Sequence, residues 1–471
     1  MNSATSTQEI ERQRQLVFNK QPAINIVAPC KLHDGVIRHS TFEKNRYMLS
    51  FLQSSDEVRF FIPASGSGSR MFQFLYDFLS YPSEETRGKT ERFLNAIEDF
   101  AFFELLPFEL KEKVRNYTID LDDFVSYLLK EEGLGLGIMP KGLLPFHRSR
   151  SFILNAFQEQ LLQGIRLREK NVDFHFTINP VFDAEIQQTL NSVKELTGRK
   201  CETSTSHQDP TTDAIAFDIN QDPVQRSSGE LLTRPSGHGA LLNNLNQQRA
   251  DIIFIKNIDN VQHESRADTS VDHLRYLGGL LQVIRDELKA IYNQSEPHEK
   301  LVKLNEKYQI FDASTEFSKL SRRDLIALIN KPLRVCGMVR NEGQPGGGPF
   351  WVEENGKKSK QIVEKSQIDM KGNQYRLMVQ SQFFNPVLMA VSTKDFDDEY
   401  FNLHDFCDEE KYFIVDKKFE GNPIQFMERP GLWNGSMADW LTVFVEVPSA
   451  TFTPVKTALD LLTPEHRDLE K

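Results

Sequence analysis

The run from Phe60 to Arg70 constrains the fold more than any other part of this chain. It reads FFIPASGSGSR, an apolar segment followed by a loop of small residues. Apolar residues then recur at helical spacing at Met71, Phe74, Leu75, Phe78 and Leu79. The pattern predicts a strand, a glycine-rich loop and an amphipathic helix. A backbone with few side chains can lie against a phosphate at a helix start, so we predict a phosphate-binding turn. An ordinary strand-to-helix turn that needs glycine for its dihedral angles is the alternative.

Size and charge narrow the function classes. With 471 residues the chain is longer than one core usually covers, and we expect two or three subdomains. The formal net charge of −11 argues against a partner such as duplex nucleic acid, whereas a small anion can still be bound by local arginines and backbone amides.

Cysteine spacing and hydropathy bear on the compartment. The cysteines are far apart and show no zinc-site or disulfide-framework spacing: Cys30, Cys201, Cys336 and Cys407. No apolar run approaches the roughly 18 residues of a membrane span, and the N-terminus is polar. We therefore expect a cytoplasmic protein with no membrane partner.

Along the chain the pattern divides into three parts. Residues 1–57 look helical, residues 58–330 alternate between helix and strand with a helical insertion at about 72–138, and residues 331–471 are richer in β structure. Within the middle part we expect a helix over residues 152–162, a strand over 174–178, another helix after Pro180, a polar loop over 203–213 and a strand over 252–255. In the last part we expect strands over residues 333–339, 361–364, 388–391 and 442–447. Strands that alternate with helices predict an α/β fold with a mixed, mostly parallel sheet and ligand loops at its C-terminal edge.

Four loops, taken in their order, resemble those of sugar-1-phosphate nucleotidyltransferases. They are PASGSGSR at 63–70, PKGLLP at 140–145, PSGHG at 235–239 and NIDN at 257–260. The stretch FTPVKTALDLL at 452–462 resembles the UDP-sugar pyrophosphorylases of the GT-A nucleotide-diphospho-sugar fold. The whole chain also resembles a bacterial domain-of-unknown-function family placed near that superfamily. The resemblance spans roughly residues 58–462 and implies a GT-A, Rossmann-like sheet flanked by helices.

The resemblance implies an activity as well. A sugar-1-phosphate would attack a nucleoside triphosphate, pyrophosphate would leave, and a nucleotide sugar would form with Mg²⁺ as cofactor. Residues 58–330 would then be the nucleotide-binding part and residues 331–471 the sugar-side and C-terminal part of one catalytic unit. Two alternatives stay open, namely a non-catalytic nucleotide-sugar-binding protein and a GT-A glycosyltransferase, although the latter normally carries an Asp-x-Asp motif where this chain has Asp259 alone.

Three cations are the candidates for charge neutralisation. Arg70 could clamp the leaving pyrophosphate with its planar fork, unless it is a surface arginine at a helix start. Lys141 lies between Pro140 and Gly142, and the resemblance implies that it faces the phosphates. The alternative is a solvated lysine in a turn. Lys456 is the lysine of the PVKT stretch, which in the family lies near the phosphates.

Other candidates would bind the nucleotide, the metal and the sugar. The nucleotide-binding candidates are Ala64, Ser65, Gly66, Ser67, Gly68, Ser69, Gln208, Gly237 and His238. The glutamine amide offers a donor and an acceptor to a uracil-like base, although glutamine is common in polar loops. The sugar-binding candidates are Glu342, Glu364, Lys365, Asn385 and Asn434. The metal candidates are Asp259, which could instead cap the next helix, and Asp439.

Two features depart from the family pattern. Serines occupy positions 65 and 67 where relatives usually place adjacent glycines, which puts the required dihedral angles in doubt. The connection between Arg70 and Lys141 is far longer than in relatives, so the insertion has to leave the fold and return.

Overall fold

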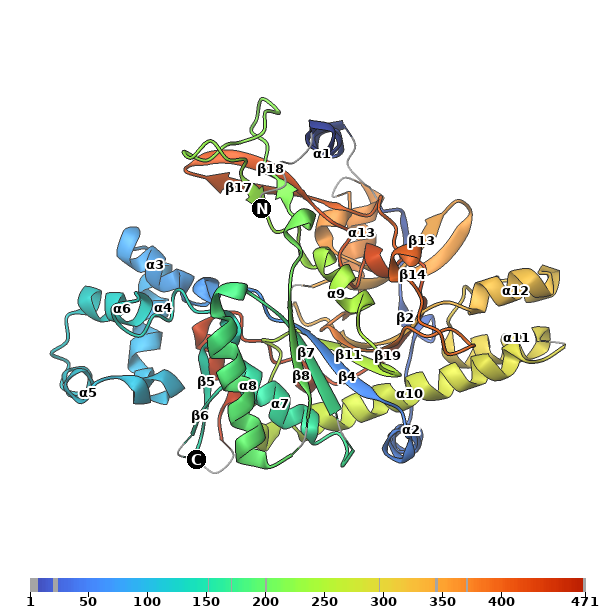
Figure 1. The fold of residues 1–471 in the computed structure, drawn as a ribbon, viewed down its shortest axis with the longest axis horizontal. Helices are drawn as coiled ribbons and strands as arrows, with labels where there is room; N and C mark the ends of the chain where they lie inside the picture. Colours follow the sequence, from blue (N-terminus) through green and yellow to red (C-terminus); the bar gives the residue numbers. More distant parts are fainter. Residues whose placement is uncertain are drawn as a thin grey trace. The chain divides into compact units, whose positions relative to one another are not determined.

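The protein has a mixed α/β fold in a computed structural model (Figure 1). The structure describes residues 7–19, 24–150, 152–170, 172–199, 201–295, 297–343, 346–369 and 372–468. The chain forms two compact units, each built from separate segments. Unit 1 contains the residues up to Asp56, Gln208–Phe254 and Tyr276–Ser449, and unit 2 contains Glu57–His207, Ile255–Arg275 and the residues from Ala450 onward. The chain first passes from unit 1 to unit 2 between residues 56 and 57, next to the predicted boundary at 57–58. The second predicted boundary, at 330–331, falls inside unit 1.

Unit 2 is built on a parallel sheet. Strand β4 (Val58–Pro63) pairs with β7 (Val172–Ile178), and β7 pairs with β8 (Thr203–His207). The rings of Phe60 and Phe174 stack with centroids 5.1 Å apart. Helix α7 (Ala156–Ile165) packs closely against this stack because Gly164 has no side chain. A Cβ there would lie 2.4 Å from the Phe174 ring. All three strands therefore direct their C-terminal ends to one edge, where β4 runs into the glycine-rich loop.

Two predictions about unit 2 were wrong at element boundaries. The helix expected over residues 152–162 begins only at Ala156, because the Asn155 side chain accepts a hydrogen bond from the backbone N–H of Gln158 and caps it. Residues Phe152–Asn155 form strand β6 instead, antiparallel to β5 (Pro145–Ser149). The polar loop expected over 203–213 begins with β8, a strand of Thr and Ser residues that has no apolar alternation to reveal it.

The predicted insertion is helical. It contains α3 (Gln73–Ser80), α4 (Glu84–Asn95), α5 (Phe108–Arg115) and α6 (Leu121–Leu129), drawn in blue to cyan in Figure 1. Phe93, Phe100 and Phe102 pack ring on ring, with centroids 4.8 to 6.0 Å apart. This aromatic cluster gives the insertion an apolar core of its own.

The strands of unit 1 pair both in parallel and antiparallel. Strand β12 (Leu333–Arg340) pairs in parallel with β19 (Leu441–Glu446) and antiparallel with β16 (Leu388–Ser392), and β19 continues in parallel to β3 (Gly35–Ile37). A second sheet contains β1 (Ile26–Pro29), β13 (Gly348–Glu354) and β14 (Lys357–Val363). The four strands predicted after residue 331 are thereby confirmed as β12, β14, β16 and β19.

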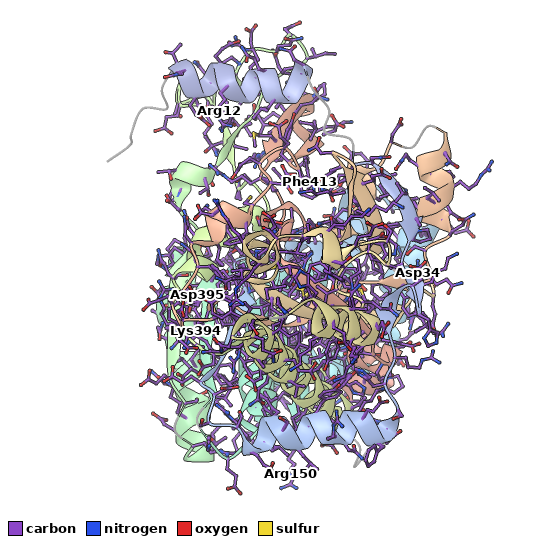
Figure 2. All side chains as sticks on the ribbon, turned by 90° about the vertical axis from the view of Figure 1, so that its right-hand side faces the viewer. Arg12, Asp34, Arg150, Lys394, Asp395 and Phe413 are labelled. Carbon is purple, nitrogen blue, oxygen red and sulfur yellow. The ribbon has the colours of Figure 1, made fainter. Side chains whose placement is uncertain are left out.

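The first 57 residues are not helical throughout, as the sequence had suggested. Between α1 (Thr7–Asn19) and α2 (Thr41–Gln53) lie β1, β2 (Lys31–Leu32) and β3, which are too short for a period-2 signal. Two hydrogen bonds join helix α1, on which Figure 2 labels Arg12, to other segments of unit 1. The Gln13 side chain accepts from the Ile215 N–H at 2.8 Å, and the Tyr412 hydroxyl donates to the Leu16 carbonyl at 3.0 Å.

The remaining elements complete both units. Helix α8 (Asp183–Thr197) belongs to unit 2, while β11 (Ile252–Lys256) and α10 (Asp268–Tyr292) each contain a changeover between the units. Unit 1 also contains α9 (Leu242–Asn246), α11 (His298–Tyr308), α12 (Arg322–Ile329), α13 (Asn373–Val379), β9 (Ala214–Ile215), β10 (Thr233–Arg234), β15 (Phe383–Phe384), β17 (Phe413–Phe419) and β18 (Asn422–Glu428). In the described part of the chain, no helix combines the length and the apolar character that crossing a membrane requires.

Candidate functional site

The glycine-rich loop of unit 2 is paired with the segment that carries Lys141. The Gly68 N–H donates to the Met139 carbonyl at 3.0 Å, and the Lys141 N–H donates to the Gly66 carbonyl at 3.0 Å. Ser67 and Pro140 form a β-bridge between these two bonds. The long insertion therefore returns beside its point of departure, and Lys141 adjoins the loop although 70 residues lie between it and Arg70.

The loop glycines allow close approach rather than left-handed backbone. None of residues 64–70 has a positive φ, so Ser65 and Ser67 fit the backbone without strain. A Cβ on Gly68 would lie 2.6 Å from Leu144 Cδ1, whereas a Cβ on Gly66 would meet nothing within 4 Å. The backbone at Gly66 thus faces open space, as a phosphate cradle requires.

The chemically most suggestive feature of unit 2 is a carboxylate shared by two lysines. Asp259 Oδ2 lies 2.6 Å from Lys141 Nζ and 2.9 Å from Lys456 Nζ. Asp259 follows the end of β11, and its carbonyl accepts from the Val455 N–H at 3.0 Å, which holds the Lys456 segment alongside. Three segments far apart in the sequence therefore meet at one oxygen atom.

The charges of this cluster are unequal. Burial alone would raise the pKa of Asp259, but the ammonium groups of Lys141 and Lys456 outweigh burial and hold that pKa below its ordinary value. Burial lowers the pKa of Lys141, and Asp259 partly counteracts this shift. Arg70, exposed at the end of the loop, adds repulsion on Lys141. One carboxylate beside two lysines leaves excess positive charge, which suits an anion.

The metal candidates do not come together as a cage. Among the described residues no three His, Cys, Asp or Glu side chains gather in a way that could hold an ion. Asp259 is deprotonated and mostly buried, while Asp439 lies in unit 1, is exposed and pairs with Lys331. A single carboxylate matches a Mg²⁺ ion that arrives with phosphate oxygens and water as its other ligands, and it does not match a resident ion held by protein alone.

The predicted nucleotide contacts of unit 1 have structural partners. Gln208 donates to Asp213 Oδ1 at 3.0 Å, so its amide is engaged within its own loop. Gly237 has φ +69°, and a Cβ there would lie 2.5 Å from a carboxylate oxygen of Glu428. His238 stacks on Trp433 with centroids 3.9 Å apart and accepts from the Leu432 N–H at 2.8 Å. Burial lowers the pKa of His238 to about 4, which keeps the ring neutral at pH 7.

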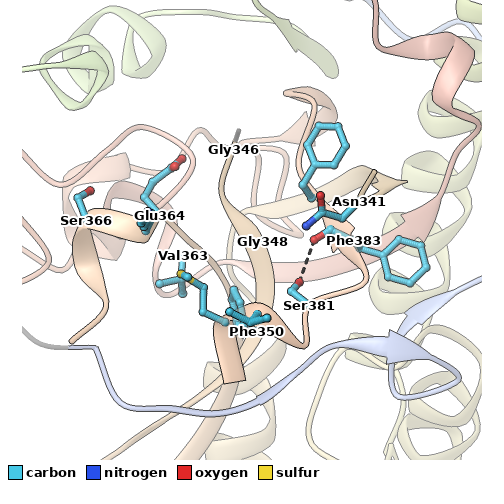
Figure 3. Close-up of a pocket in the computed structure, with 13 residues that line it drawn as sticks. Asn341, Gly346, Gly348, Phe350, Val363, Glu364, Ser366, Ser381 and Phe383 are labelled. Carbon is cyan, nitrogen blue, oxygen red and sulfur yellow. Dashed lines mark hydrogen bonds between the residues drawn. The ribbon is translucent and has the colours of Figure 1, made fainter. Parts of the chain in front are cut away.

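The predicted sugar contacts of unit 1 divide into two groups. Glu364 and Lys365 line a cavity of about 840 Å³, together with Phe350, Phe383 and Phe384 (Figure 3). Burial raises the pKa of Glu364. Asn385 and Asn434 are buried and bond to backbone, the first accepting from the Val387 N–H at 3.0 Å and the second donating to the Ile362 carbonyl at 2.7 Å. These two asparagines therefore stabilise loops in this structure.

Figure 3 shows a hydrogen bond between two lining residues, in which the Ser381 hydroxyl donates to the Phe383 carbonyl at 2.9 Å. Glu342 lies on the same glycine-containing segment as Gly346, which also lines the cavity. Of the three residues between them, Gln344 and Pro345 fall outside the described residues.

The sequence did not single out several residues that hold the cluster of Lys141, Asp259 and Lys456 in place. Asn260, next to Asp259, donates to the Thr451 carbonyl at 3.2 Å and accepts from the Thr453 N–H at 3.0 Å. Its position in the NIDN motif could have singled it out. His147 and His466 are buried and hydrogen-bonded to each other, yet 319 residues separate them and no motif marks either.

Comparisons with known proteins give a family and several structural likenesses. The family model described as "Domain of unknown function (DUF4301)" matches residues 1–467. No curated protein sequence matches the chain. A mutant of UDP-glucose pyrophosphorylase from Leishmania major is similar at 12% identity and a TM-score of 0.46, covering 98% of this chain and 76% of that one. A protein described as UDP-glucose phosphorylase from Trypanosoma brucei is similar at 12% identity and a TM-score of 0.43, covering 94% and 70%.

Proposed function

Because this chain belongs to the DUF4301 family, whose description states no activity, we propose a function from the site itself. The protein is a nucleotidyltransferase that joins a sugar-1-phosphate to a nucleoside triphosphate and releases pyrophosphate. The observation that carries this proposal is the pair of lysines on Asp259 Oδ2 beside the glycine-rich loop. The order of the loops in the sequence, which resembles sugar-1-phosphate nucleotidyltransferases, supports the choice of reaction.

The cluster suits a triphosphate for electrostatic reasons. Asp259 neutralises only one of the two ammonium groups and keeps both close together before a ligand arrives. Phosphate oxygens can replace the carboxylate oxygen as the partners of Lys141 and Lys456, so the positive charge is already in position. The backbone at Gly66 faces open space, so a phosphate can approach it without a side chain in the way.

The reaction needs positioning rather than covalent help from the protein. A phosphate oxygen of the sugar-1-phosphate attacks the α-phosphorus, a P–O bond forms, and the bond to the β-phosphate oxygen breaks with its electron pair leaving on pyrophosphate. The attacking oxygen is already anionic, so no base has to remove a proton. Lys141, Lys456 and Arg70 stabilise the negative charge that builds up on the leaving group.

Mg²⁺ is the proposed cofactor, and Asp259 is the side chain that would hold it. The ion, when bound, spreads the negative charge of the phosphates as a Lewis acid. On the sequence resemblance alone, Gln208 and His238 are proposed to recognise the nucleoside, and Glu364 and Lys365 the sugar side.

A pyrophosphate-release assay tests the proposal. The wild-type protein is incubated with Mg²⁺, each common nucleoside triphosphate and a panel of sugar-1-phosphates. At least one pair should release pyrophosphate, and Lys141→Ala and Lys456→Ala should each lower kcat by about 10²-fold or more, as loss of a charge-stabilising group does. Lys111→Ala is the control, because Lys111 in the same unit is as shielded as Lys141 but pairs with Glu104. Binding without release across the whole panel would contradict the enzyme and favour a nucleotide-sugar-binding protein.

A further inference from the structure

A chain of buried hydrogen bonds in unit 2 ends on the segment that carries Lys456. His147 Nδ1 lies 2.6 Å from Glu159 Oε1, and His147 Nε2 lies 2.8 Å from His466 Nδ1. His466 Nε2 lies 3.1 Å from the carbonyl oxygen of Thr453. The exposed fractions of Glu159, His147 and His466 are 0%, 1% and 4%, so water does not compete for these bonds.

The last acceptor fixes the direction of every bond in the chain. A carbonyl oxygen can only accept, so His466 Nε2 must carry a proton and donate it to Thr453. Burial lowers the pKa of His466 to about 3 and holds that of His147 well below its ordinary value, so both rings are neutral at pH 7. A neutral ring donates through one nitrogen and accepts through the other, so His147 donates to His466 and accepts from Glu159.

Glu159 completes this pattern as a carboxylic acid. Burial raises its pKa to about 8, so at pH 7 the acid form can donate to His147 Nδ1. The neighbouring His263 ring, with its centroid 5.5 Å from that of His147, bonds instead to Ser265 and to the Arg148 carbonyl. The chain from Glu159 to Thr453 is thus internally consistent without any net charge.

The far end of the chain bears directly on the position of Lys456. Thr453 is held at both backbone groups, since its N–H donates to Asn260 Oδ1 and its carbonyl accepts from His466. Val455 donates its N–H to the Asp259 carbonyl at 3.0 Å, immediately before Lys456. The side chain of Lys456 is 51% exposed, so packing alone does not fix it and its backbone anchor matters.

We propose that His466, backed by His147 and Glu159, is a positioning residue that holds the Thr453–Lys456 backbone so that Lys456 meets Asp259. His466 touches neither the lysine nor the carboxylate and acts through the Thr453 carbonyl. The catalytic consequence rests on the proposed function, whereas the anchoring of the backbone does not.

Paired substitutions separate this role from simple packing. His466→Gln keeps a donor for Thr453 and an acceptor for His147, while His466→Leu keeps volume but neither hydrogen bond. His175→Leu is the matched control, because His175 is also buried in unit 2 and bonded on both ring nitrogens, to Ser204 and Ser206 at 2.8 Å each. If His466→Leu does not fold, His466→Asn, whose shorter amide does not span both partners, takes its place.

Amide hydrogen exchange is the readout that does not depend on activity. The N–H groups of Thr453 and Val455 should exchange about tenfold faster or more in His466→Leu, and within about twofold of wild type in His466→Gln and His175→Leu. Equal exchange in all three variants would overturn the positioning role. Equal acceleration in His466→Leu and His175→Leu would do the same, because it would report general loosening.

Kinetics then test whether His466 acts through Lys456. In the pyrophosphate-release assay His466→Leu should lower kcat about tenfold and His466→Gln should restore most of it. When His466→Leu is added to Lys456→Ala, kcat should fall by a further factor of less than about two. The effects of two residues that act as one unit are not additive. A full additional tenfold loss would contradict action through Lys456. Absence of release from the wild type would count against the proposed function, and the exchange measurement alone would then decide the anchoring.

Discussion

At the scale of single residues, the position of Asp259 sets a balance between stability and ligand binding. Its carboxylate holds two ammonium groups in the protein before any ligand is present. A phosphate ligand has to compete with that carboxylate for both lysines. The same side chain therefore stabilises the empty site and opposes metal-free binding of an anion.

The substitution Asp259→Asn tests this balance directly. We expect it to lower the free energy of unfolding by about 1–3 kcal/mol, because the mostly shielded Lys141 loses its counter-charge. Inorganic pyrophosphate without Mg²⁺ should then raise the melting temperature of the variant more than that of the wild type. Glu85→Gln is the control, since its pair with Lys89 is exposed and its loss should leave the free energy of unfolding almost unchanged. An equal response to pyrophosphate in wild type and Asp259→Asn would contradict this account.

At the scale of elements, strand β4, the glycine-rich loop and residues 139–141 form one continuous structural unit. The loop is held by its backbone pairing to residues 139–141, and none of its residues has a positive φ. Gly68 is required by the neighbouring Leu144 side chain, whereas Gly66 faces empty space. Two glycines two residues apart therefore have separable roles.

Alanine at each glycine should separate these roles. Gly68→Ala should destabilise the protein by about 1–3 kcal/mol, because its Cβ would lie 2.6 Å from Leu144 Cδ1 and 2.9 Å from the Met139 carbonyl. Gly66→Ala should leave the melting temperature nearly unchanged and weaken triphosphate binding about tenfold by crowding the phosphates. Denaturation curves and isothermal titration with a nucleoside triphosphate measure the two effects. Unaltered binding by Gly66→Ala would place the phosphates elsewhere.

Elements with a strong apolar period could be predicted from the sequence, and others could not. Strands β4 and β7 and helices α3 and α6 follow directly from such periods, whereas α5 has no buried residue to mark it. The start of α7 depends on the Asn155 cap, and β8 is polar, so periodicity misplaced both. The meeting of Lys141 with Asp259 was consistent with the loop order, whereas the bond between His147 and His466 depends on tertiary packing across 319 residues.

At the scale of the whole molecule, buried neutral histidines make the fold sensitive to acid. Burial lowers the pKa of His175 and His238 to about 4 and of His466 to about 3, and holds that of His147 far below 6.5. Below about pH 6.5 the unfolded chain binds protons at these sites that the folded protein does not bind. Glu159 acts in the opposite direction, because its raised pKa gives the folded state one extra proton between about pH 4.5 and 8.

The four histidines outnumber Glu159 and Glu364, the glutamates whose pKa burial raises, so stability should fall as the pH decreases from 6.5 to 4.5. Each proton that only the unfolded state binds contributes about 1.4 kcal/mol per pH unit in the window where it is fully bound. Urea denaturation at a series of pH values measures how steeply the free energy of unfolding changes with pH. His175→Gln should reduce this slope by about 1.4 kcal/mol per pH unit, the contribution of one proton. A free energy of unfolding that stays constant or rises as the pH falls through this range would show that these rings are not buried and neutral.

Site-resolved lysine labelling shows whether Lys141 and Lys456 together bind a triphosphate. The native protein is treated with an amine-acylating reagent with and without a nucleoside triphosphate and Mg²⁺, and modification at each lysine is quantified by mass spectrometry. Lys111 and Lys89 are matched controls in the same unit, because their side chains are 18% and 48% exposed against 16% and 51% for Lys141 and Lys456. We predict that saturating triphosphate slows labelling of Lys141 and Lys456 at least about fivefold and leaves both controls unchanged, since an amine held by phosphate is neither free nor neutral. Labelling of Lys141 and Lys456 that does not respond to any triphosphate would contradict the account.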